Sequence, residues 1–298
     1  MRPSYKPVIT VGLLALAVSF CAAATISGTV KGVDGAPFRG AFVEAQNTKT
    51  KIDTIVLSNS QGQYSIDNLQ PGDYRLRIRA VGYTATPKSG LNLTSDQKEF
   101  VDFALQTEPV RWSDISISAG KELFPPGKGK EILMSQCVIC HSFQTRMATA
   151  SKDADQWRAV VDTMRTTMHF HLYRVTDDDA DTLAQYLANL FGPDSVLPKS
   201  PADIPEYKGT VRTFTSDASN IVYVEYDMPS ANRMPFGAAP DNNGFAWIPN
   251  FGYANKISRL DVETGVMQDF TVPNVGTAAI HCAVPAPDGS VWHPPQLA

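Results

Sequence analysis

The hydrophobic residues of this chain change their spacing twice, and this change limits what the chain can fold into. From Thr25 to about Gln106, apolar and polar residues alternate in short runs separated by turn residues such as Asp34-Gly35. This pattern is typical of antiparallel strands with one face on a core. From Trp112 to about Phe191 the apolar residues recur at helical spacing, and after about residue 208 short strands return. The sequence therefore predicts a multidomain protein with β, then α, then β structure.

Length and composition agree with this organisation and exclude several classes of protein. The 298 residues suffice for two or three domains. Hydrophobic residues make up 43% and charged residues 19%, which excludes a disordered polyelectrolyte, a coiled coil and a collagen-like fibre. The formal net charge of −4 gives no reason to expect nucleic acid or an acidic membrane surface as a partner.

Residues 1–24 have the features of a secretory signal peptide. Arg2 and Lys6 precede an apolar run from Val8 to Phe20, and Ala22-Ala23-Ala24 fits a cleavage site. The run is shorter than the ~20 residues that a spanning helix needs. We therefore expect an exported protein, periplasmic or extracellular, with no transmembrane segment in the mature chain. A retained N-terminal anchor is the alternative, and bulky Phe20 disfavours a lipid anchor on Cys21.

Residues 25–107 carry the pattern of a small β-sandwich. Tyr74, Leu76 and Ile78 alternate with three arginines, as in a strand that covers a core. The segments that follow resemble the carboxypeptidase regulatory-like domain, an immunoglobulin-like or transthyretin-like sandwich: Gly28-Thr29-Val30, Asp34-Gly35-Ala36-Pro37, Gly40-Ala41-Phe42-Val43, Gly62-Gln63-Tyr64, Leu69-Gln70-Pro71-Gly72-Asp73-Tyr74 and Gly82-Tyr83. The resemblance implies a structural or docking module, with carbohydrate binding as the alternative.

The strongest chemical signal is Cys137-Val138-Ile139-Cys140-His141. This C-x-x-C-H spacing is the attachment motif of c-type haem. Two thiols on one turn are placed to add across the two vinyl groups of one porphyrin, and the adjacent imidazole reaches the iron. The motif predicts one covalent haem c, bound through Cys137 and Cys140, with His141 as the proximal iron ligand. A thioredoxin-like pair would not need His141, and a zinc site lacks a second Cys/His pair.

Residues 113–195 resemble a short class I cytochrome c domain. Gly129 lies eight residues before Cys137, as in the first helix of that family, and Leu183-Ala184-Gln185-Tyr186-Leu187 resembles its final helix, which packs on the first. The family usually supplies a distal methionine from a later loop beside proline, and that pair is absent. A short subset of the family carries a tryptophan, a valine and a methionine on the middle helix, as Trp157, Val161 and Met164 do here. By this resemblance Met164 is the preferred candidate for the distal ligand. The other candidates, in order of preference, are Met168, then His169 or His171, and Met147 is the weakest.

Residues 208–298, after a Pro-rich linker over 196–207, contain an internal repeat. Ala239-Pro240-Asp241 leads to Trp247, and Ala286-Pro287-Asp288 leads to Trp292, 45 residues after the first tryptophan. With Asn255–Asp261 and Thr264-Gly265, these motifs resemble the virginiamycin B (streptogramin) lyase family of β-propellers. The resemblance covers about two blades, so we expect a partial β-propeller whose further blades lie beyond this sequence.

No catalytic residue is assigned in the C-terminal segment. The catalytic His and Glu of the lyase family belong to later blades. His281 and His293 are expected to be ordinary loop residues, and Cys282 a buried free thiol.

The sequence thus predicts an exported monohaem cytochrome that transfers electrons to or from a redox partner protein or a small-molecule donor or acceptor. Two alternatives stay open. One is the N-terminal fragment of a propeller enzyme, a lyase or dehydrogenase with a fused haem domain. The other is a cell-surface carbohydrate-binding protein.

Overall fold

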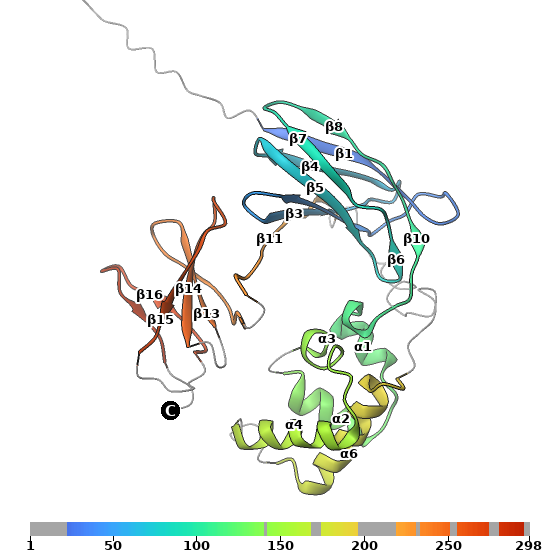
Figure 1. The fold of residues 1–298 in the computed structure, drawn as a ribbon, viewed down its shortest axis with the longest axis vertical. Helices are drawn as coiled ribbons and strands as arrows, with labels where there is room; N and C mark the ends of the chain where they lie inside the picture. Colours follow the sequence, from blue (N-terminus) through green and yellow to red (C-terminus); the bar gives the residue numbers. More distant parts are fainter. Residues whose placement is uncertain are drawn as a thin grey trace, which may run out of the picture.

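The computed structural model describes residues 23–139, 142–167, 174–195, 219–230, 233–250, 255–273 and 280–294. Figure 1 shows a β-sandwich in blue to green, a helical region in green to yellow, and a small C-terminal sheet in orange to red. The predicted signal peptide lies almost wholly outside the described residues. Ala24, at its predicted end, begins the first strand and is fully buried.

Two sheets form the sandwich and confirm the predicted fold of its segment. In one, β1 (Ala24–Lys31) lies between β4 (Gln63–Leu69) and β8 (Lys98–Phe100), and β9 (Phe103–Ala104) also pairs with β1. The other has the order β11 (Tyr223–Tyr226), β3 (Ile52–Leu57), β2 (Phe42–Asn47), β5 (Gly72–Arg79) and β7 (Lys88–Leu93). A short pair, β6 (Tyr83–Thr84) with β10 (Gln106–Thr107), leads toward the helices.

The apolar residues of the strands face the core, as the two-residue period of a strand requires. Tyr74 and Leu76 of β5 are buried, whereas Arg75, Arg77 and Arg79 lie on the other face. The hydroxyl of Tyr64 is also inside, where it donates a hydrogen bond of 2.5 Å to the Val101 carbonyl. Burial raises the pKa of this phenol above its ordinary value. Tyr64 therefore packs in the core.

The outer face of the second sheet carries two buried carboxylates. Glu44 and Asp53 are 1% and 2% exposed. Arg77 and Arg79 cover them: both pair with Glu44, and the Arg77 Nη2 lies 3.8 Å from the Asp53 Oδ1. Gln46 donates a hydrogen bond of 2.9 Å to the Asp53 Oδ2. The face is therefore a charged network that excludes water from its acidic members.

Strand β11 comes from the C-terminal segment and completes the sandwich sheet, which the sequence did not predict. It pairs antiparallel with β3, with Tyr223 opposite Ile55 and Tyr226 opposite Ile52. The Tyr223 ring packs on Phe42 at 5.9 Å, and Glu225 lies 3.1 Å from Arg79. A segment assigned by its sequence to the propeller part thus belongs to the N-terminal domain.

The described residues between 112 and 191 are mainly helical, as their spacing predicts. The elements are η1 (Trp112–Asp114), α1 (Ile117–Leu123), α2 (Lys128–Ile132), the π-helical turn η2 (Leu133–Cys137), α3 (Phe143–Arg146), α4 (Ala154–Thr167) and α6 (Asp177–Phe191). Their core centres on four rings, Trp112, Phe124, Phe143 and Phe191, whose centroids lie 5.0–6.4 Å apart. In the described part of the chain, no helix is long and apolar enough to cross a membrane.

The C-terminal segment forms a four-stranded antiparallel sheet and a hairpin. The sheet runs β12 (Ala239–Pro240), β13 (Phe245–Asn250), β14 (Lys256–Asp261) and β15 (Met267–Thr271), and the hairpin joins β16 (Val284–Pro285) to β17 (Val291–Trp292). Ala239 lies opposite Trp247, and 45 residues later Val284 lies opposite Trp292. The two hairpins therefore have the same register relative to their tryptophans, although Ala286-Pro287 lies two residues beyond the position equivalent to Ala239-Pro240. The described residues do not close into a ring.

Candidate functional site

The helix that leads to the C-x-x-C-H motif ends in a widened turn. α2 passes directly into η2, whose last residue is Cys137, and the Val138 N–H donates to the Leu133 carbonyl at 3.1 Å. π-Helical turns occur frequently at functional sites. Cys137 is half-buried and packs against the helical core. Cys140 and His141 lie outside the described residues.

Gly129 fixes how α2 crosses α6. A Cβ added at Gly129 would lie 2.4 Å from the Cβ of Tyr186, so only glycine allows the two helices this close. The Tyr186 hydroxyl donates a hydrogen bond of 2.8 Å to the Pro125 carbonyl, and burial raises the pKa of this phenol to about 12. The structure thus packs α2 on α6 at Gly129 and Tyr186, two of the residues on which the cytochrome resemblance was based.

Helix α4 presents the predicted apolar face to the same core. Trp157 and Val161 are buried, and Met164 is half-buried against the core. Met147 is buried in that core, as a packing residue would be. The other distal candidates, Met168, His169 and His171, lie outside the described residues.

The described residues of this region fit a large apolar group that carries carboxylates. Several partly exposed apolar residues pack on the helical core, and we refer to five of them as the rim residues: Met134, Cys137, Val138, Val160 and Met164. The Nε1 atoms of Trp157 and of Trp112 are buried and have no hydrogen-bond partner among the described residues. Buried indole N–H groups normally find an acceptor. The rim residues and the two unpaired donors are therefore compatible with a haem.

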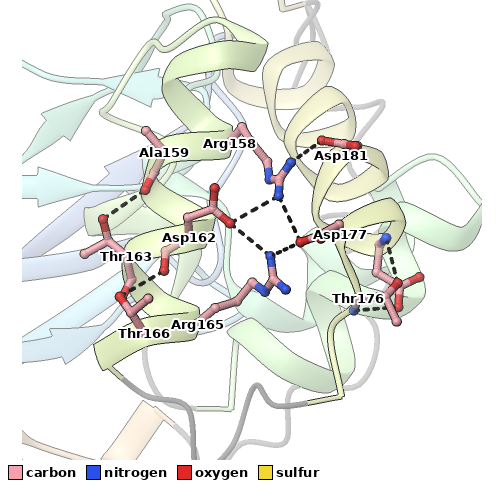
Figure 2. Close-up of polar contacts among 10 residues, drawn as sticks. Arg158, Ala159, Asp162, Thr163, Arg165, Thr166, Thr176, Asp177 and Asp181 are labelled. Atoms are coloured by element: carbon pink, nitrogen blue, oxygen red, sulfur yellow. Dashed lines mark hydrogen bonds and ion pairs between the residues drawn. The ribbon is translucent and has the colours of Figure 1, made fainter.

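Ion pairs connect α4 to the start of α6. Figure 2 shows Arg158 and Arg165 of α4 converging on Asp177 of α6, with N–O distances of 3.3 and 2.7 Å. Arg158 also lies 2.5 Å from Asp181, and Asp162 of α4 accepts from both arginines at 3.3 and 3.0 Å. We call these five residues the α4–α6 clamp.

The same turn of α6 also holds α2. Thr176 and Asp179 form a capping box, in which each side chain bonds the backbone N–H of the other residue at 3.2 Å. Asp179 lies 2.5 Å from the Lys128 ammonium at the start of α2. One turn therefore contacts both the helix before Cys137 and the helix that carries Met164.

Two of the three acidic groups of this turn, Asp177 and Asp179, are charged at neutral pH. The hydrogen bond from Arg165 lowers the pKa of Asp177 below its ordinary value. The hydrogen bond from Lys128 does the same to the pKa of Asp179, and the Thr176 backbone adds to the effect. Carboxylates in a first helical turn also suit the helix dipole. The contacts of the turn are therefore charge-assisted under ordinary conditions.

The remaining candidates of the sequence lie in the C-terminal part. The His281 ring packs on Phe236 at a centroid distance of 4.1 Å, and Cys282 is a half-buried free cysteine. Within the described ranges, no three His, Cys, Asp or Glu side chains gather as a metal site.

The sequence interpretation did not single out Arg158, Arg165 or Asp181. A signal for them exists in the spacing of Arg158, Asp162 and Arg165 at i, i+4 and i+7, which places all three on one helix face. This spacing does not show which helix the face contacts, because α6 follows only after an intervening segment of the chain.

Comparison with known proteins supports the assignment of the N-terminal domain. Residues 25–106 match the carboxypeptidase regulatory-like domain family. No curated protein matches the chain. The similar solved structures include the TIE protein of Bacillus anthracis, with 16% identity, 29% of this chain and 17% of that chain covered, and a TM-score of 0.25.

Two further structures cover a similar share of the chain. A type II cohesin–X-dockerin complex from Acetivibrio cellulolyticus matches at 15% identity over 32% of this chain and 64% of that chain, with a TM-score of 0.26. GBS52, the minor pilin of Streptococcus agalactiae, matches at 18% identity over 30% of this chain and 46% of that chain, with a TM-score of 0.24. The chain spans less than two thirds of each of the three, and TM-scores this low carry no functional inference. It is the family match, together with the observed sandwich, that identifies residues 25–106 as a carboxypeptidase regulatory-like domain.

Proposed function

We propose that this protein is an exported monohaem c-type cytochrome that transfers electrons through one covalently attached haem. The observation that carries the proposal is the Cys137–His141 motif, which follows an N-terminal segment with the features of a secretory signal. The helical region supports it, because the helix before the motif crosses α6 at Gly129 and Tyr186. The electron partner is a redox protein or a small-molecule donor or acceptor.

Each residue of the site has a distinct task in this proposal. The thiols of Cys137 and Cys140 would form thioether bonds, and the His141 imidazole would be the proximal ligand. Met164 is the first choice for the distal ligand and Met168 the alternative, one turn further along the same helix. The bound haem iron would supply the one-electron exchange. A methionine sulfur opposite a histidine favours the reduced iron and so raises the reduction potential.

The surrounding side chains would shield the site. The rim residues Val138, Val160 and Met134 pack on the helical core and would exclude water from one side. The unpaired Nε1 of Trp157, on the same face of α4 as Met164, would donate a hydrogen bond to a carboxylate of the group. These contacts would orient the group without forming a covalent bond.

Covalent attachment tests the proposal directly. We expect the full chain, exported from cells with c-type maturation, to keep haem on a denaturing gel. Cys137→Ala and Cys140→Ala should each reduce the haem stain strongly, because one of two thioether bonds is lost. Cys282→Ala is the matched control and should stain like the parent. A parent protein without stain would overturn the proposed function.

The C-terminal part supports a second, finer proposal. The four-stranded sheet and the repeated Ala239–Trp247 and Val284–Trp292 registers are what successive blades of a propeller would give. We propose that residues 208–298 include the first blades of such a propeller, while β11 pairs with the sandwich. Enzymatic activity as a lyase or dehydrogenase would then require residues from further blades.

A further inference from the structure

We propose that Asp177 is a positioning residue for the distal side of the haem site, through its contacts with Arg158 and Arg165. By holding both arginines it fixes the rotation of α4, and this rotation decides where Met164 presents its sulfur. The inference rests on the proposed function and adds to it a group that does not itself touch the haem.

The clamp has the geometry of a two-point anchor. Asp177 Oδ1 accepts from Arg165 at 2.7 Å and from Arg158 at 3.3 Å (Figure 2). The two arginines are seven residues apart and therefore project from the same side of α4, two turns from one another. Their side chains are only 25% and 27% exposed. Both arginines meet the same Asp177 oxygen, and Arg158 also lies 2.5 Å from Asp181, so α4 is held to α6 at two points along one of its sides. Contacts at two such points resist both rotation of the helix about its axis and tilting of the helix.

The anchor lies beside the functional face of the helix. Met164 directly precedes Arg165, and Trp157 directly precedes Arg158, so each apolar residue is offset by about 100° from its arginine. Trp157 is buried and Met164 half-buried in the helical core. A small rotation about the helix axis would therefore move the Met164 side chain and change its direction.

The other polar contacts in Figure 2 do not hold α4 in place. The hydroxyl of Thr163 donates to the Ala159 carbonyl at 2.9 Å, and that of Thr166 donates to the Asp162 carbonyl at 3.1 Å. Both bonds lie within α4 and leave its rotation free. The clamp is thus the polar connection between α4 and α6 in this part of the described chain.

The same turn of α6 fixes the opposite side of the site. Asp179 binds Lys128 at the start of α2, and α2 leads through η2 to Cys137. Asp177 and Asp179 are two residues apart, so α4, which carries Met164, and α2, which precedes Cys137, are both held by the first turn of α6. The turn therefore sets the spacing between the two sides of the site.

The clamp is expected to act on geometry more than on stability. Ion pairs that water reaches contribute little to the free energy of folding, because solvent and salt screen them. Losing Asp177 should leave the core and the Arg158–Asp181 contact intact. It should release Arg165 from α6 and so free the orientation of the part of α4 that carries Met164. A readout specific to the methionine sulfur is therefore required.

The experiment compares Asp177→Asn with Asp178→Asn in the full, haem-loaded protein. Asp178 is exposed, lies in the same turn and makes no ion pair with any described residue. Both variants lose one negative charge, which alone would raise the reduction potential slightly in each. Loss of methionine ligation has the opposite sign and lowers the potential.

We expect Asp177→Asn to weaken the near-infrared sulfur-to-iron band of the oxidised protein at least twofold and to lower the potential. Amide hydrogen exchange over residues 154–167 should quicken at least threefold. Asp178→Asn should keep the band and the exchange rates, and Asp177→Glu should restore most of the band.

The outcomes distinguish a failure of the inference about Asp177 from a failure of the proposed function. A haem-loaded parent with the band, and an Asp177→Asn protein with an unchanged band and unchanged exchange, would overturn the inference and leave the proposed function standing. Equal loss of the band in the Asp178→Asn protein would also overturn it. A parent without covalent haem would overturn the proposed function, and the inference with it. A haem-loaded parent without the band would overturn the inference alone.

Discussion

Among single residues, Asp53 is the clearest case in which burial and charge oppose one another. It is 2% exposed on the outer face of the sandwich and lies near the acidic groups of Asp227 and Glu225, with Arg77 as the neighbouring cation. Burial raises the pKa of Asp53 above 3.8, and the hydrogen bond from Gln46 only partly offsets this. The folded chain therefore holds the Asp53 proton more tightly than the unfolded chain does.

This shift predicts how stability depends on pH. Because the folded-state pKa of Asp53 is raised, its contribution is favourable below pH 3.8 and is lost as pH rises through the folded-state pKa. Asp53→Asn keeps an oxygen for the Gln46 bond and removes the buried charge. We expect the variant to have a higher free energy of unfolding than the parent at pH 7 and an equal one near pH 3. Urea denaturation at both pH values measures the difference.

Glu44 provides the contrast to this prediction. Glu44 pairs with both Arg77 and Arg79, which are about half exposed. Glu44→Gln should lower the free energy of unfolding by about 1–3 kcal/mol, less than the ~3–5 kcal/mol of a fully buried pair, because water reaches the arginines it leaves. A lower stability for Asp53→Asn at pH 7 would show that the attraction of Arg77 exceeds the effect of burial.

At the scale of elements, the crossing of α2 and α6 has a steric cause. The two helices meet where Gly129 faces Tyr186, and no side chain fits between them. The crossing matters for the proposed site because α2 leads through η2 to Cys137. At Gly129, helix propensity favours a larger residue such as alanine, whereas packing against Tyr186 favours glycine. A substitution at Gly129 therefore shows which of the two effects is larger.

We expect Gly129→Ala to destabilise the helical region by about 1–3 kcal/mol, the usual range for overpacking. Propensity alone would give a gain of about 1 kcal/mol in a helix interior. Thermal melting followed by circular dichroism at 222 nm measures the effect. Ser118→Ala, at an exposed position of α1, should change little. A stabilised Gly129→Ala protein would mean that the helices separate without penalty.

At the scale of the whole molecule, β11 connects the C-terminal part to the N-terminal domain. It lies more than 160 residues after β3 in the sequence, yet it forms the edge of the same sheet. The Tyr226 hydroxyl donates to the Val262 carbonyl at 2.8 Å, next to the turn between β14 and β15. β11 therefore joins the sandwich to the small sheet.

Charge reversal at β11 should loosen this connection. Glu225→Lys replaces the partner of Arg79, 3.1 Å away, with a like charge. An exposed pair contributes about 0.2–1 kcal/mol, and repulsion adds to its loss, so amide exchange in residues 223–226 should quicken about threefold to tenfold. Hydrogen exchange with mass spectrometry measures the rates.

Glu263→Lys is the matched control for this prediction. It makes the same charge change in an exposed turn with no ion pair to any described residue. Equal quickening in both variants, or none in either, would contradict a specific contribution of Glu225 to the docking of β11.

The sequence by itself determined which segments are strands and which are helices, because burial of one face leaves a period in the residues. Tyr74 and Leu76 alternate with arginines, and α6 ends at Phe191, where the helical spacing of the sequence also ends. The 45-residue repeat likewise predicted the matching hairpins. The C-x-x-C-H motif gave the candidate site, and it remains a prediction.

Only the tertiary structure decided which elements meet. The pattern of residues 221–226 predicts a strand but not that its partner is β3, since an edge accepts any strand of suitable register. The clamp of Arg158 and Arg165 on Asp177 needs two helices brought together across a loop. Burial of Glu44 and Asp53 depends on arginines from a neighbouring strand. The local sequence indicates which face of each segment is buried, whereas contacts between distant segments depend on how the whole chain folds in space.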